Sequence, residues 1–484
     1  MPLIKSISGI RGTIGGVPGE SLTPVDIVKF VYAYCACMRE RKPQANGEKY
    51  KVVVGKDGRI SGAMVEDLVT GTLVSCGVDV VKCGYASTPT TEMAVVLSKA
   101  DGGIIITASH NPRQWNALKL LNEKGEFLTA AEGQAVLDCA ESGNFDFAGV
   151  DELGHVTEHD FTDEHIESVL ALRDVDCEAI RNAGFTVVLD PVNSVGAIIM
   201  PRLLERLGVN CITINQEVSG DFAHNPEPLP SNLVELSNTV VDYHADLGIS
   251  VDPDVDRLAF ICEDGSPFIE ENTLVSIADY LLSRASSIAS TENVTLEEAT
   301  APYAPVTVSN LSSSRALRDV TEKWGGTYYA AAVGEVNVTT MIHSKNALFG
   351  GEGNGGVIFP RAHCGRDAMV GVGLFLSYLA ARGAKMTEIK ASLPQYTIVK
   401  NRIDLSDSSV IDFILSEVKK VYASKGRITD IDGVKIDFDD ERKWVHLRKS
   451  NTEPIIRIYA EAPTEDSAQE LSNELLGFVH RLIS

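Results

Sequence analysis

The sequence predicts an α/β protein in which three related α/β domains, with parallel or mixed sheets, and a C-terminal α+β domain surround a central cleft. Two observations support this prediction. A unit of strand, polar turn, helix, glycine and strand occurs three times, and the segment after about residue 395 alternates between apolar and polar residues as antiparallel strands do. At 484 residues the chain is also too long for a single core.

The repeated unit is defined by its apolar runs and by the glycine that ends each predicted helix. The first strands are expected at 51–55, 185–189 and 304–308, and the second strands at 78–81, 209–214 and 327–331. Two strands joined by one helix normally lie parallel in the same sheet. Each unit therefore predicts one piece of parallel sheet.

Downstream of each unit, a third apolar strand runs into a polar loop. Residues 102–106 lead into Thr107–Pro112, residues 247–251 into Asp252–Arg257, and residues 347–349 into Gly350–Gly356. In open α/β sheets, ligands bind at the carboxyl ends of the strands. Three equivalent loops with different chemistry therefore predict three parts of one functional site.

We expect domain boundaries where the pattern changes. The predicted domains are 1–155 with a serine loop, 156–263 with an acidic loop, 264–385 with a glycine-rich loop, and 395–484 with a basic turn. A linker is expected near 381–395. The last domain should contain strands at 433–438, 444–448 and 455–460 and a closing amphipathic helix at 464–483.

Composition argues against several classes of partner. The chain has 43 basic and 67 acidic residues, a formal net charge of −24, which argues against nucleic acid or an anionic membrane as the main partner. The apolar run 368–381 is too short to span a bilayer and predicts a core helix. The N-terminus has no signal core, and nine scattered cysteines without a CxxC pair fit reduced thiols in a cytoplasmic protein. An anionic substrate would need a locally basic pocket.

The serine loop places Ser109 at the end of a buried strand. A hydroxyl held at that edge is a candidate nucleophile or phosphate carrier. His110 lies beside it, and Pro112 turns the chain away. Ser, Asn and Pro are also common turn residues, so an ordinary turn remains open at this point.

The acidic loop gives the strongest metal signal. Asp252, Asp254 and Asp256 offer the carboxylate oxygens that Mg²⁺ prefers, but in a regular strand the first and last would lie roughly 13 Å apart. The loop must therefore curl, which Pro253 permits. An EF-hand is excluded because Arg257 stands where the calcium loop requires glycine. A solvated acidic turn remains the alternative.

The glycine-rich loop and the basic turn suit a sugar phosphate. Residues 357–360 form a predicted strand, whereas a dinucleotide-binding glycine motif must open a helix. Glu352 and Asn354 instead offer groups for sugar hydroxyls, with a plain hairpin as the alternative. Arg448–Pro454 together with Arg457 gathers donors for a phosphate, with a solvated charged turn as the alternative.

Together these motifs resemble the α-D-phosphohexomutase superfamily along essentially the whole chain. The matching motifs are Ser8–Gly12, Thr107–Pro112, Asp252–Arg257, Gly350–Gly356 and Arg448–Pro454. The resemblance implies a four-domain enzyme that moves a phosphoryl group between two positions of a hexose phosphate. It also implies a phosphoserine enzyme, a hexose bisphosphate intermediate, and a monomer or homodimer.

The resemblance further implies residue roles. Ser109 would be phosphorylated and, with Asp252, Asp254 and Asp256, would hold one Mg²⁺. Arg11 and His110 would contact the reacting phosphoryl group, and Lys119 would transfer a proton. The substrate would be bound by Arg257, Glu335, Glu352, Asn354, Arg448, Lys449, Ser450, Asn451, Thr452 and Arg457.

Two departures from the family pattern favour an amino sugar. The loop ends in Asn354-Gly355-Gly356 where many relatives have Ser-Gly-His, and Glu335 stands where glucose- and mannose-handling relatives tend to carry histidine. This pattern is similar to that of archaeal-type phosphoglucosamine mutases, and an acidic Glu335 would attract a protonated 2-amino group. Phosphomannomutase or phosphoglucomutase activity, a metal-dependent sugar phosphatase and a non-catalytic sugar-phosphate sensor remain alternatives.

Overall fold

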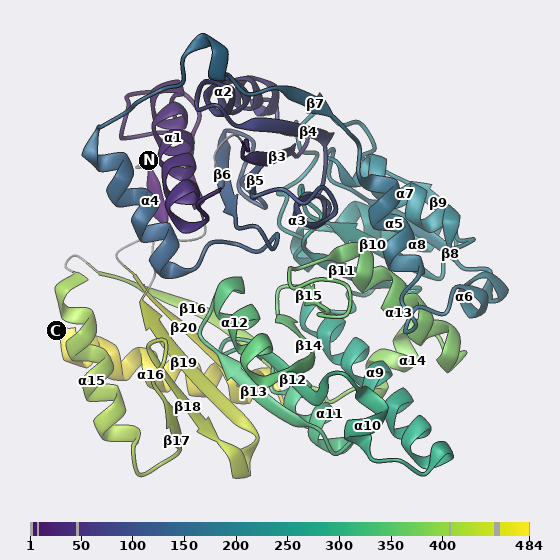
Figure 1. The fold of residues 1–484 in the computed structure, drawn as a ribbon. Coiled ribbons are helices and arrows are strands. Elements are labelled where there is room, and N and C mark those ends of the chain that lie inside the picture. The colour runs from purple at the N-terminus through teal and green to yellow at the C-terminus, as the bar shows by residue number, and fades with distance from the viewer. Residues whose placement is uncertain (1–2, 7–8, 45–47, 406–407, 450–454, 484) are drawn as a thin grey trace. The chain divides into compact units, whose positions relative to one another are not determined.

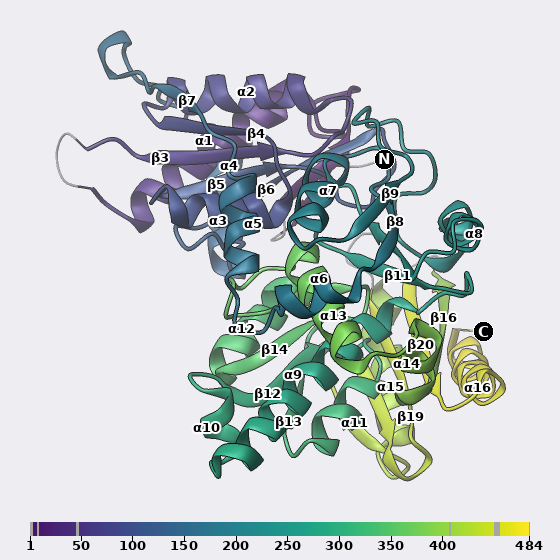
Figure 2. The same cartoon turned by 90° about the vertical axis from the view of Figure 1, so that its right-hand side faces the viewer.

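The computed structural model describes residues 3–6, 9–44, 48–405, 408–449 and 455–483. By their internal contacts the residues divide into two compact units. The first comprises Met1–Thr273 and Gly355–Ile389, and the second comprises Leu274–Asn354 and Lys390–Ser484. Figures 1 and 2 trace the chain through both units by colour.

The first unit begins with a seven-stranded sheet of order β1-β2-β6-β5-β3-β4-β7. Strands β5, β3, β4 and β7 run parallel, and β6, β2 and β1 extend the sheet in antiparallel pairs. The elements are β1 (Ile4–Ser6), β2 (Gly9–Thr13), α1 (Pro24–Arg41), β3 (Lys51–Lys56), α2 (Gly62–Ser75), β4 (Asp79–Tyr85), α3 (Thr88–Leu97), β5 (Gly102–Ile106), β6 (Trp115–Leu121), α4 (Ala130–Ser142) and β7 (Val156–Glu158).

Alternating side chains bury both faces of this sheet. Val52 and Val54 join one core cluster with residues of α1, α2 and α4, whereas Val53 and Ile105 join another with residues of α3. Successive strand residues point to opposite faces, so an unbroken apolar run is what a sheet covered on both sides requires. Figure 2 shows the helices along this sheet.

The second sheet of this unit repeats the plan in the order β11-β10-β8-β9. Strands β10, β8 and β9 are parallel, and β11 is antiparallel to β10. Its elements are α5 (Thr162–Leu170), α6 (Cys177–Ala183), β8 (Thr186–Asp190), α7 (Gly196–Arg206), β9 (Asn210–Thr213), α8 (Val234–Asp242), β10 (Leu247–Val251) and β11 (Leu258–Cys262). The later segment of the unit adds β15 (Gly356–Ile358), α13 (Ala368–Arg382) and α14 (Met386–Ser392).

The second unit contains the third copy of the plan, in which β14, β12 and β13 lie parallel in that order. This order of third, first and second strand also describes β5-β3-β4 and β10-β8-β9, so the predicted threefold repeat is confirmed. The elements are α9 (Glu270–Glu292), α10 (Leu296–Thr300), β12 (Ala304–Asn310), α11 (Ala316–Lys323), β13 (Thr327–Ala331), α12 (Glu335–Lys345) and β14 (Ala347–Glu352).

The C-terminal part of the second unit is the predicted α+β domain. Its five-stranded antiparallel sheet has the order β16-β20-β19-β18-β17, and apolar residues of α15 and α16 share its core. The elements are β16 (Thr397–Asp404), α15 (Ile411–Tyr422), β17 (Arg427–Thr429), β18 (Val434–Phe438), β19 (Lys443–Lys449), β20 (Ile455–Ala462) and α16 (Glu465–Ile483).

Two expectations about helices can be compared with the structure. The predicted core helix is confirmed, because the residues of α13 from Ala368 to Leu379 are all buried. The segment 381–395, expected as a linker, contains the change from the first unit to the second, after Ile389. It also carries the short helix α14, whose Met386 and Ile389 are buried. Short helices with few apolar positions leave little periodic signal. In the described ranges, no helix combines the length and apolarity needed to cross a membrane.

Candidate active site

Ser109 lies in the loop between the antiparallel strands β5 and β6. Its φ is +50°, in the left-handed region that few non-glycine residues adopt. Its N–H donates to Thr107 Oγ1 at 2.9 Å, and Thr107 Oγ1 donates to Asp57 Oδ2 at 2.6 Å. The Ser109 hydroxyl donates to Asp252 Oδ2 at 2.8 Å. The serine loop and the acidic loop therefore meet at the serine oxygen.

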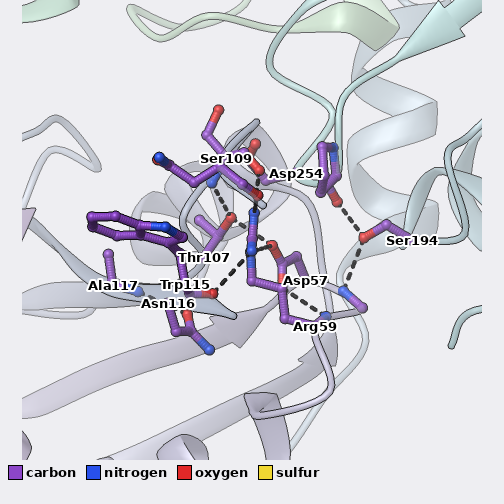
Figure 3. A network of polar contacts seen from close by, with 12 residues as sticks. Asp57, Arg59, Thr107, Ser109, Trp115, Asn116, Ala117, Ser194 and Asp254 are labelled. Atoms are coloured by element: carbon purple, nitrogen blue, oxygen red, sulfur yellow. Dashed lines mark hydrogen bonds and ion pairs between the residues drawn. The ribbon is translucent and has the colours of Figure 1, made fainter. Parts of the chain in front are cut away.

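Arg59, from the turn after β3, fixes the serine loop. Its guanidinium donates to four backbone carbonyl oxygens of that loop at 2.5 to 2.9 Å (Figure 3). These carbonyls belong to Ser109, Asn111, Pro112 and Trp115. Arg59 Nε also donates to Asp57 Oδ2 at 3.1 Å, and both side chains are fully buried. The loop cannot shift without breaking several charge-assisted hydrogen bonds.

The acidic loop between β10 and β11 curls as its carboxylate spacing requires. The Val255 N–H donates to the Asp252 carbonyl oxygen at 3.0 Å and closes a turn. One carboxylate oxygen from each of Asp252, Asp254 and Asp256 lies within 4.8 Å of the others, and all three residues are buried. Asp252 Oδ1 accepts from the N–H groups of Asp256 and Arg257, both at 3.1 Å. The predicted curl is confirmed.

The remaining carboxylate oxygens suit a metal ion. Within the described residues, the buried Oδ1 atoms of Asp254 and Asp256 have no hydrogen-bond partner. The pKa of Asp252 is raised well above its usual value, first by burial and then by the Asp256 and Asp254 carboxylates. Buried oxygens that repel one another and lack donors are what a divalent cation compensates. The residues present therefore fit a cation with oxygen ligands.

Cationic side chains surround these carboxylates. Lys119 Nζ donates to Asp254 Oδ2 at 2.7 Å, and Arg366 Nη2 donates to Asp256 Oδ2 at 2.7 Å. Burial alone would lower the pKa of Lys119, but the two aspartates outweigh it and the pKa is raised. Lys119 and Arg366 therefore offset part of the negative charge of the three aspartates.

Arg11, His110 and Arg257 belong to the same site. Arg11 Nη1 donates to Asn111 Oδ1 at 2.8 Å, and Arg257 Nη1 donates to Glu227 Oε1 at 3.1 Å. His110 Nδ1 is 3.4 Å from the serine hydroxyl oxygen. The pKa of His110 is lowered well below its usual value, first by burial and then by Arg257 and Arg11. The histidine is therefore a neutral imidazole in a strongly cationic environment.

In the second unit, Glu352 is held firmly within the glycine-rich loop. It is buried, and its Oε1 accepts from Asn310 Nδ2 at 2.9 Å and from the Gly334 N–H at 3.1 Å. Glu335 follows Gly334 as the first residue of α12 and is also buried. The structure thus brings the N–H of Gly334, the residue before Glu335, into contact with the Glu352 carboxylate, while Asn354 is partly exposed.

Three arginines stand in a row across the C-terminal sheet. Arg402 of β16 is opposite Arg457 of β20, and Arg457 is opposite Arg448 of β19. Like charges directly across neighbouring strands destabilise a sheet, so an anion bound here would relieve their repulsion. Asp432 Oδ2 accepts from the Val333 N–H at 3.0 Å and lies 3.5 Å from Arg448 Nη1. Asp432 therefore connects the arginine row to the segment that precedes Glu335.

Part of the predicted phosphate-binding loop lies outside the described residues. Ser450, Asn451 and Thr452 fall within 450–454, and Ser8 of the first motif falls within 7–8. Lys449, the last residue of β19, is exposed. The roles of these residues remain predictions.

Several polar residues in and around these loops were not anticipated. They are Arg59, Thr88, Arg366, Arg402 and Asp432. The first three contact residues that are distant in the sequence, so no local pattern reveals them. Thr88, for example, donates from its Oγ1 to Asp254 Oδ2 at 2.7 Å. Arg402 lies in β16, whose residues Thr397–Asp404 do not alternate regularly between apolar and polar, so this strand also leaves little local signal.

Comparison with known proteins identifies the family. Alpha/beta/alpha domains I, II and III of phosphoglucomutase/phosphomannomutase match residues 4–146, 163–265 and 277–396, and the C-terminal domain of that family matches 402–477. The chain belongs to the phosphoglucomutase/phosphomannomutase family. It is therefore a phosphohexomutase of the α-D-phosphohexomutase superfamily, an isomerase whose substrate is a sugar phosphate.

Curated relatives in this family cover nearly the whole chain. A phosphoglucomutase/phosphomannomutase of Thermococcus kodakarensis is 34% identical and covers 95% of this chain and 96% of its own length. A phosphoglucosamine/phosphogalactosamine mutase of Sulfurisphaera tokodaii is 33% identical, with coverages of 96% and 97%. A probable phosphoglucosamine mutase of Methanopyrus kandleri is 31% identical, with coverages of 98% and 97%.

Solved structures share the fold. A phosphoglucomutase/phosphomannomutase family protein from Burkholderia thailandensis matches with a TM-score of 0.80 and 22% identity, covering 99% of this chain and 98% of its own. An Aspergillus fumigatus N-acetylphosphoglucosamine mutase, in complex with GlcNAc-6P and magnesium, matches with a TM-score of 0.57 and 12% identity, covering 93% and 96%. At these identities the likeness concerns the fold alone.

Proposed function

We propose that the chain is a phosphoglucosamine mutase, which interconverts glucosamine 6-phosphate and glucosamine 1-phosphate. The proposed carrier is phosphorylated Ser109, and the proposed intermediate is a hexosamine 1,6-bisphosphate. The observation that carries the choice of sugar is the pair of buried acidic residues Glu335 and Glu352, joined through Gly334. Curated relatives named phosphoglucosamine mutase support it.

The proposed reaction consists of two phosphoryl transfers. First, the free hydroxyl oxygen of the sugar phosphate attacks the phosphorus carried by Ser109. The bond from phosphorus to Ser109 Oγ breaks, and the proton lost by the sugar hydroxyl ends on that oxygen. After the bisphosphate reverses its orientation, Ser109 Oγ attacks the other phosphorus. The bond from that phosphorus to the sugar oxygen breaks, and the serine proton ends on the sugar oxygen. Such transfers depend mainly on positioning and on charge neutralisation.

The residues around Ser109 supply both requirements in this proposal. Arg59 holds the loop carbonyls, so the serine oxygen stays in place. Arg11 and Arg257 neutralise charge on the phosphoryl oxygens, and Lys119 moves the proton. Mg²⁺ held by Asp252, Asp254 and Asp256 would polarise a phosphoryl oxygen as a Lewis acid.

The amino sugar is favoured by the charge of the second unit's site. A glucosamine phosphate carries a cationic 2-amino group and an anionic phosphate. Glu335 and Glu352 would attract the first, and the row of Arg402, Arg457 and Arg448 would bind the second. A neutral hydroxyl at the 2-position, as in glucose or mannose, would be attracted less strongly by two buried acidic residues.

The test is a substrate comparison with phosphorylated, Mg²⁺-loaded protein. Glucosamine, galactosamine, glucose and mannose 6-phosphates are supplied separately, and formation of each 1-phosphate is measured by ³¹P NMR. We expect the highest kcat/KM for glucosamine 6-phosphate. Preference for glucose or mannose would contradict the amino-sugar assignment. Stoichiometric release of inorganic phosphate without any 1-phosphate would indicate a phosphatase instead.

A single substitution tests the acidic pair directly. Glu335→Gln removes the negative charge and keeps the size of the side chain. We expect about a tenfold loss of kcat/KM for glucosamine 6-phosphate, the effect of losing one charged contact, and less than a twofold change for glucose 6-phosphate. Glu322→Gln, at an exposed position of α11, is the matched control. Equal losses of kcat/KM for both sugars would mean that Glu335 does not distinguish an amino group from a hydroxyl at the 2-position.

A further inference from the structure

A second buried polar cluster lies in the first unit, outside every motif that the sequence pointed to. His165 Nε2 is 2.8 Å and His363 Nε2 is 3.0 Å from the same oxygen, Asp367 Oδ2. His363 Nδ1 faces Glu92 Oε2 at 3.4 Å, and His165 Nδ1 is 3.0 Å from Thr90 Oγ1. These residues come from α3, α5 and the segment before α13. We call them the histidine network.

The backbone is shaped to accommodate this network. The other carboxylate oxygen of Asp367 accepts from the N–H groups of Met369 and Val370, which caps α13. A Cβ on Gly365 would lie 1.9 Å from Glu92 Oε2, so only glycine lets this segment approach the carboxylate. The network is therefore fixed at both ends by helix starts, those of α3 and α13.

The starts of α3 and α13 also contact the carboxylates of the acidic loop. Arg366, next to the capping Asp367, donates to Asp256 Oδ2 at 2.7 Å. Thr88, in the same first turn of α3 as Thr90, donates to Asp254 Oδ2 at 2.7 Å. Both contacts occupy Oδ2 and leave the Oδ1 atoms without a hydrogen-bond partner among the described residues.

We propose that the histidine network is a positioning device for the metal site, acting through Arg366 and Thr88. It fixes the two helix starts, these fix the Oδ2 atoms of Asp254 and Asp256, and the Oδ1 atoms are left oriented for a cation. Some residues orient metal ligands without contacting the metal themselves. Their removal typically lowers the metal affinity by about 10- to 100-fold. The inference rests on the proposed metal role of the acidic loop.

Hydrogen bonds from the two histidines to Asp367 hold the histidine network together. Distances of 2.8 and 3.0 Å are hydrogen-bond distances, so both imidazoles donate to one carboxylate oxygen. Burial alone would lower the pKa of His363, but Asp367 and Glu92 outweigh it and raise the pKa to about 10. Replacing His363 with glutamine therefore keeps one donor and removes the charge of that imidazole.

The test measures Mn²⁺ binding to the full-length, dephosphorylated protein by EPR, with no sugar present. We expect His363→Gln and His165→Gln each to raise the Mn²⁺ dissociation constant about tenfold. His224→Gln is the matched control, because His224 Nε2 contacts Asp190 at 2.9 Å in the same unit but touches no metal-loop carboxylate. It should change the constant by less than twofold.

Further measurements distinguish a specific loss of metal affinity from a general loss of folding. Far-UV circular dichroism and the unfolding midpoint without metal report on folding, and the KM for the sugar phosphate should stay within twofold. The Mg²⁺ concentration for half-maximal activity should rise with the Mn²⁺ constant. Unchanged Mn²⁺ affinity in both folded histidine variants overturns the proposal. So does a Zn²⁺ ion that the wild-type protein binds in addition to Mn²⁺ and that His363→Gln no longer binds.

A double-mutant cycle tests the route through Arg366. If Asp367 acts through this arginine, Asp367→Asn should weaken Mn²⁺ binding much less in an Arg366→Gln background than in the wild type. Additive effects would overturn that route. Mn²⁺ binding without any hexose-phosphate turnover would refute the proposed function and leave this inference standing.

Discussion

The proposed catalytic residues of the first unit and the row of three arginines in the second unit are held in different ways. Ser109, Lys119 and the three aspartates of the acidic loop are all buried, and each has close partners from distant segments. In the second unit, Arg448 is only partly buried and Lys449 is exposed. Three arginines also lie side by side there, with Asp404 3.7 Å from Arg402 and Asp432 3.5 Å from Arg448.

This difference fits the proposed roles, in which the first unit carries the reactive groups and the second holds the substrate. Preorganised charges accelerate a reaction only if they need not move when it occurs, so the reactive groups must be fixed during folding. A phosphate-binding site can remain electrostatically unsatisfied until its ligand arrives. Changes in the first unit should therefore abolish chemistry or metal binding, and changes in the second should weaken substrate binding.

The largest effect is expected at the proposed phosphate carrier. Ser109→Ala removes the hydroxyl and should lower kcat by about 10³-fold or more, as loss of a covalent nucleophile does. Intact-protein mass spectrometry should show no phosphorylated form. Ser75→Ala, whose hydroxyl only contacts its own helix, should keep full activity. A Ser109→Ala protein with a tenth of wild-type activity would exclude a phosphoserine mechanism.

The next largest effect concerns the metal loop. At a Mg²⁺ concentration 100 times its dissociation constant, binding should stabilise the wild-type protein by about 2.7 kcal/mol. Asp254→Asn should remove most of this gain, because it removes a ligand charge from a buried site. Calorimetric unfolding with and without Mg²⁺ measures the difference. Asp160→Asn, at an exposed residue paired with Arg202, should keep the gain.

A smaller effect is expected in the arginine row. Arg448→Ala should raise the KM for the sugar phosphate about 10- to 100-fold with little change in kcat, since a hydrogen bond to a charged group contributes about 1.5–3 kcal/mol. The Arg402 side chain is 62% exposed, so water screens its charge and Arg402→Ala should raise the KM less than fivefold. Steady-state kinetics of both variants checks this. Equal effects would mean that the phosphate lies in the middle of the row.

The last prediction concerns stability alone. Burial raises the pKa of Glu461 to about 7 from 4.5, although its carboxylate accepts from Trp444 Nε1 at 2.7 Å. The folded state holds this proton where the unfolded state has lost it. Stability from Glu461 is therefore fully present below about pH 4.5 and is lost as the pH rises through 7, on the order of 1–3 kcal/mol.

Glu461→Gln should reduce the dependence of the free energy of unfolding on pH, because an amide stays neutral at every pH. The free energy of unfolding, measured with denaturant from pH 5 to 8, should fall less in the variant than in the wild type. Glu465→Gln, at the start of α16, is the control for a general charge effect. Identical slopes in Glu461→Gln and the wild type would mean that Glu461 is ionised throughout.

Sequence reasoning succeeded where a local pattern fixes the local structure. The apolar run 102–106 and the triad Asp252, Asp254 and Asp256 each have a spacing that only one conformation satisfies, a buried strand and a curled loop. Their positions in the structure agree with that reading.

The residues that support these motifs could not be read from the sequence. Arg366 and His165 act through partners about 100 and 200 residues away, and each has an ordinary local context. Similarly, 381–395 contains no long apolar period, so a short buried helix there looked like a linker. Long-range polar pairing depends on how the sheets are placed, which local periodicity does not encode.

The left-handed backbone at Ser109 has a consequence for the choice of amino acid. Threonine carries the same hydroxyl and accepts a phosphoryl group equally well. Its branched β-carbon is poorly tolerated at a φ of +50°, where the left-handed conformation already costs roughly 1–2 kcal/mol. In the proposed mechanism the main chain at Ser109 therefore disfavours threonine as the phosphoryl carrier, and such an exchange would require rebuilding the loop around Arg59.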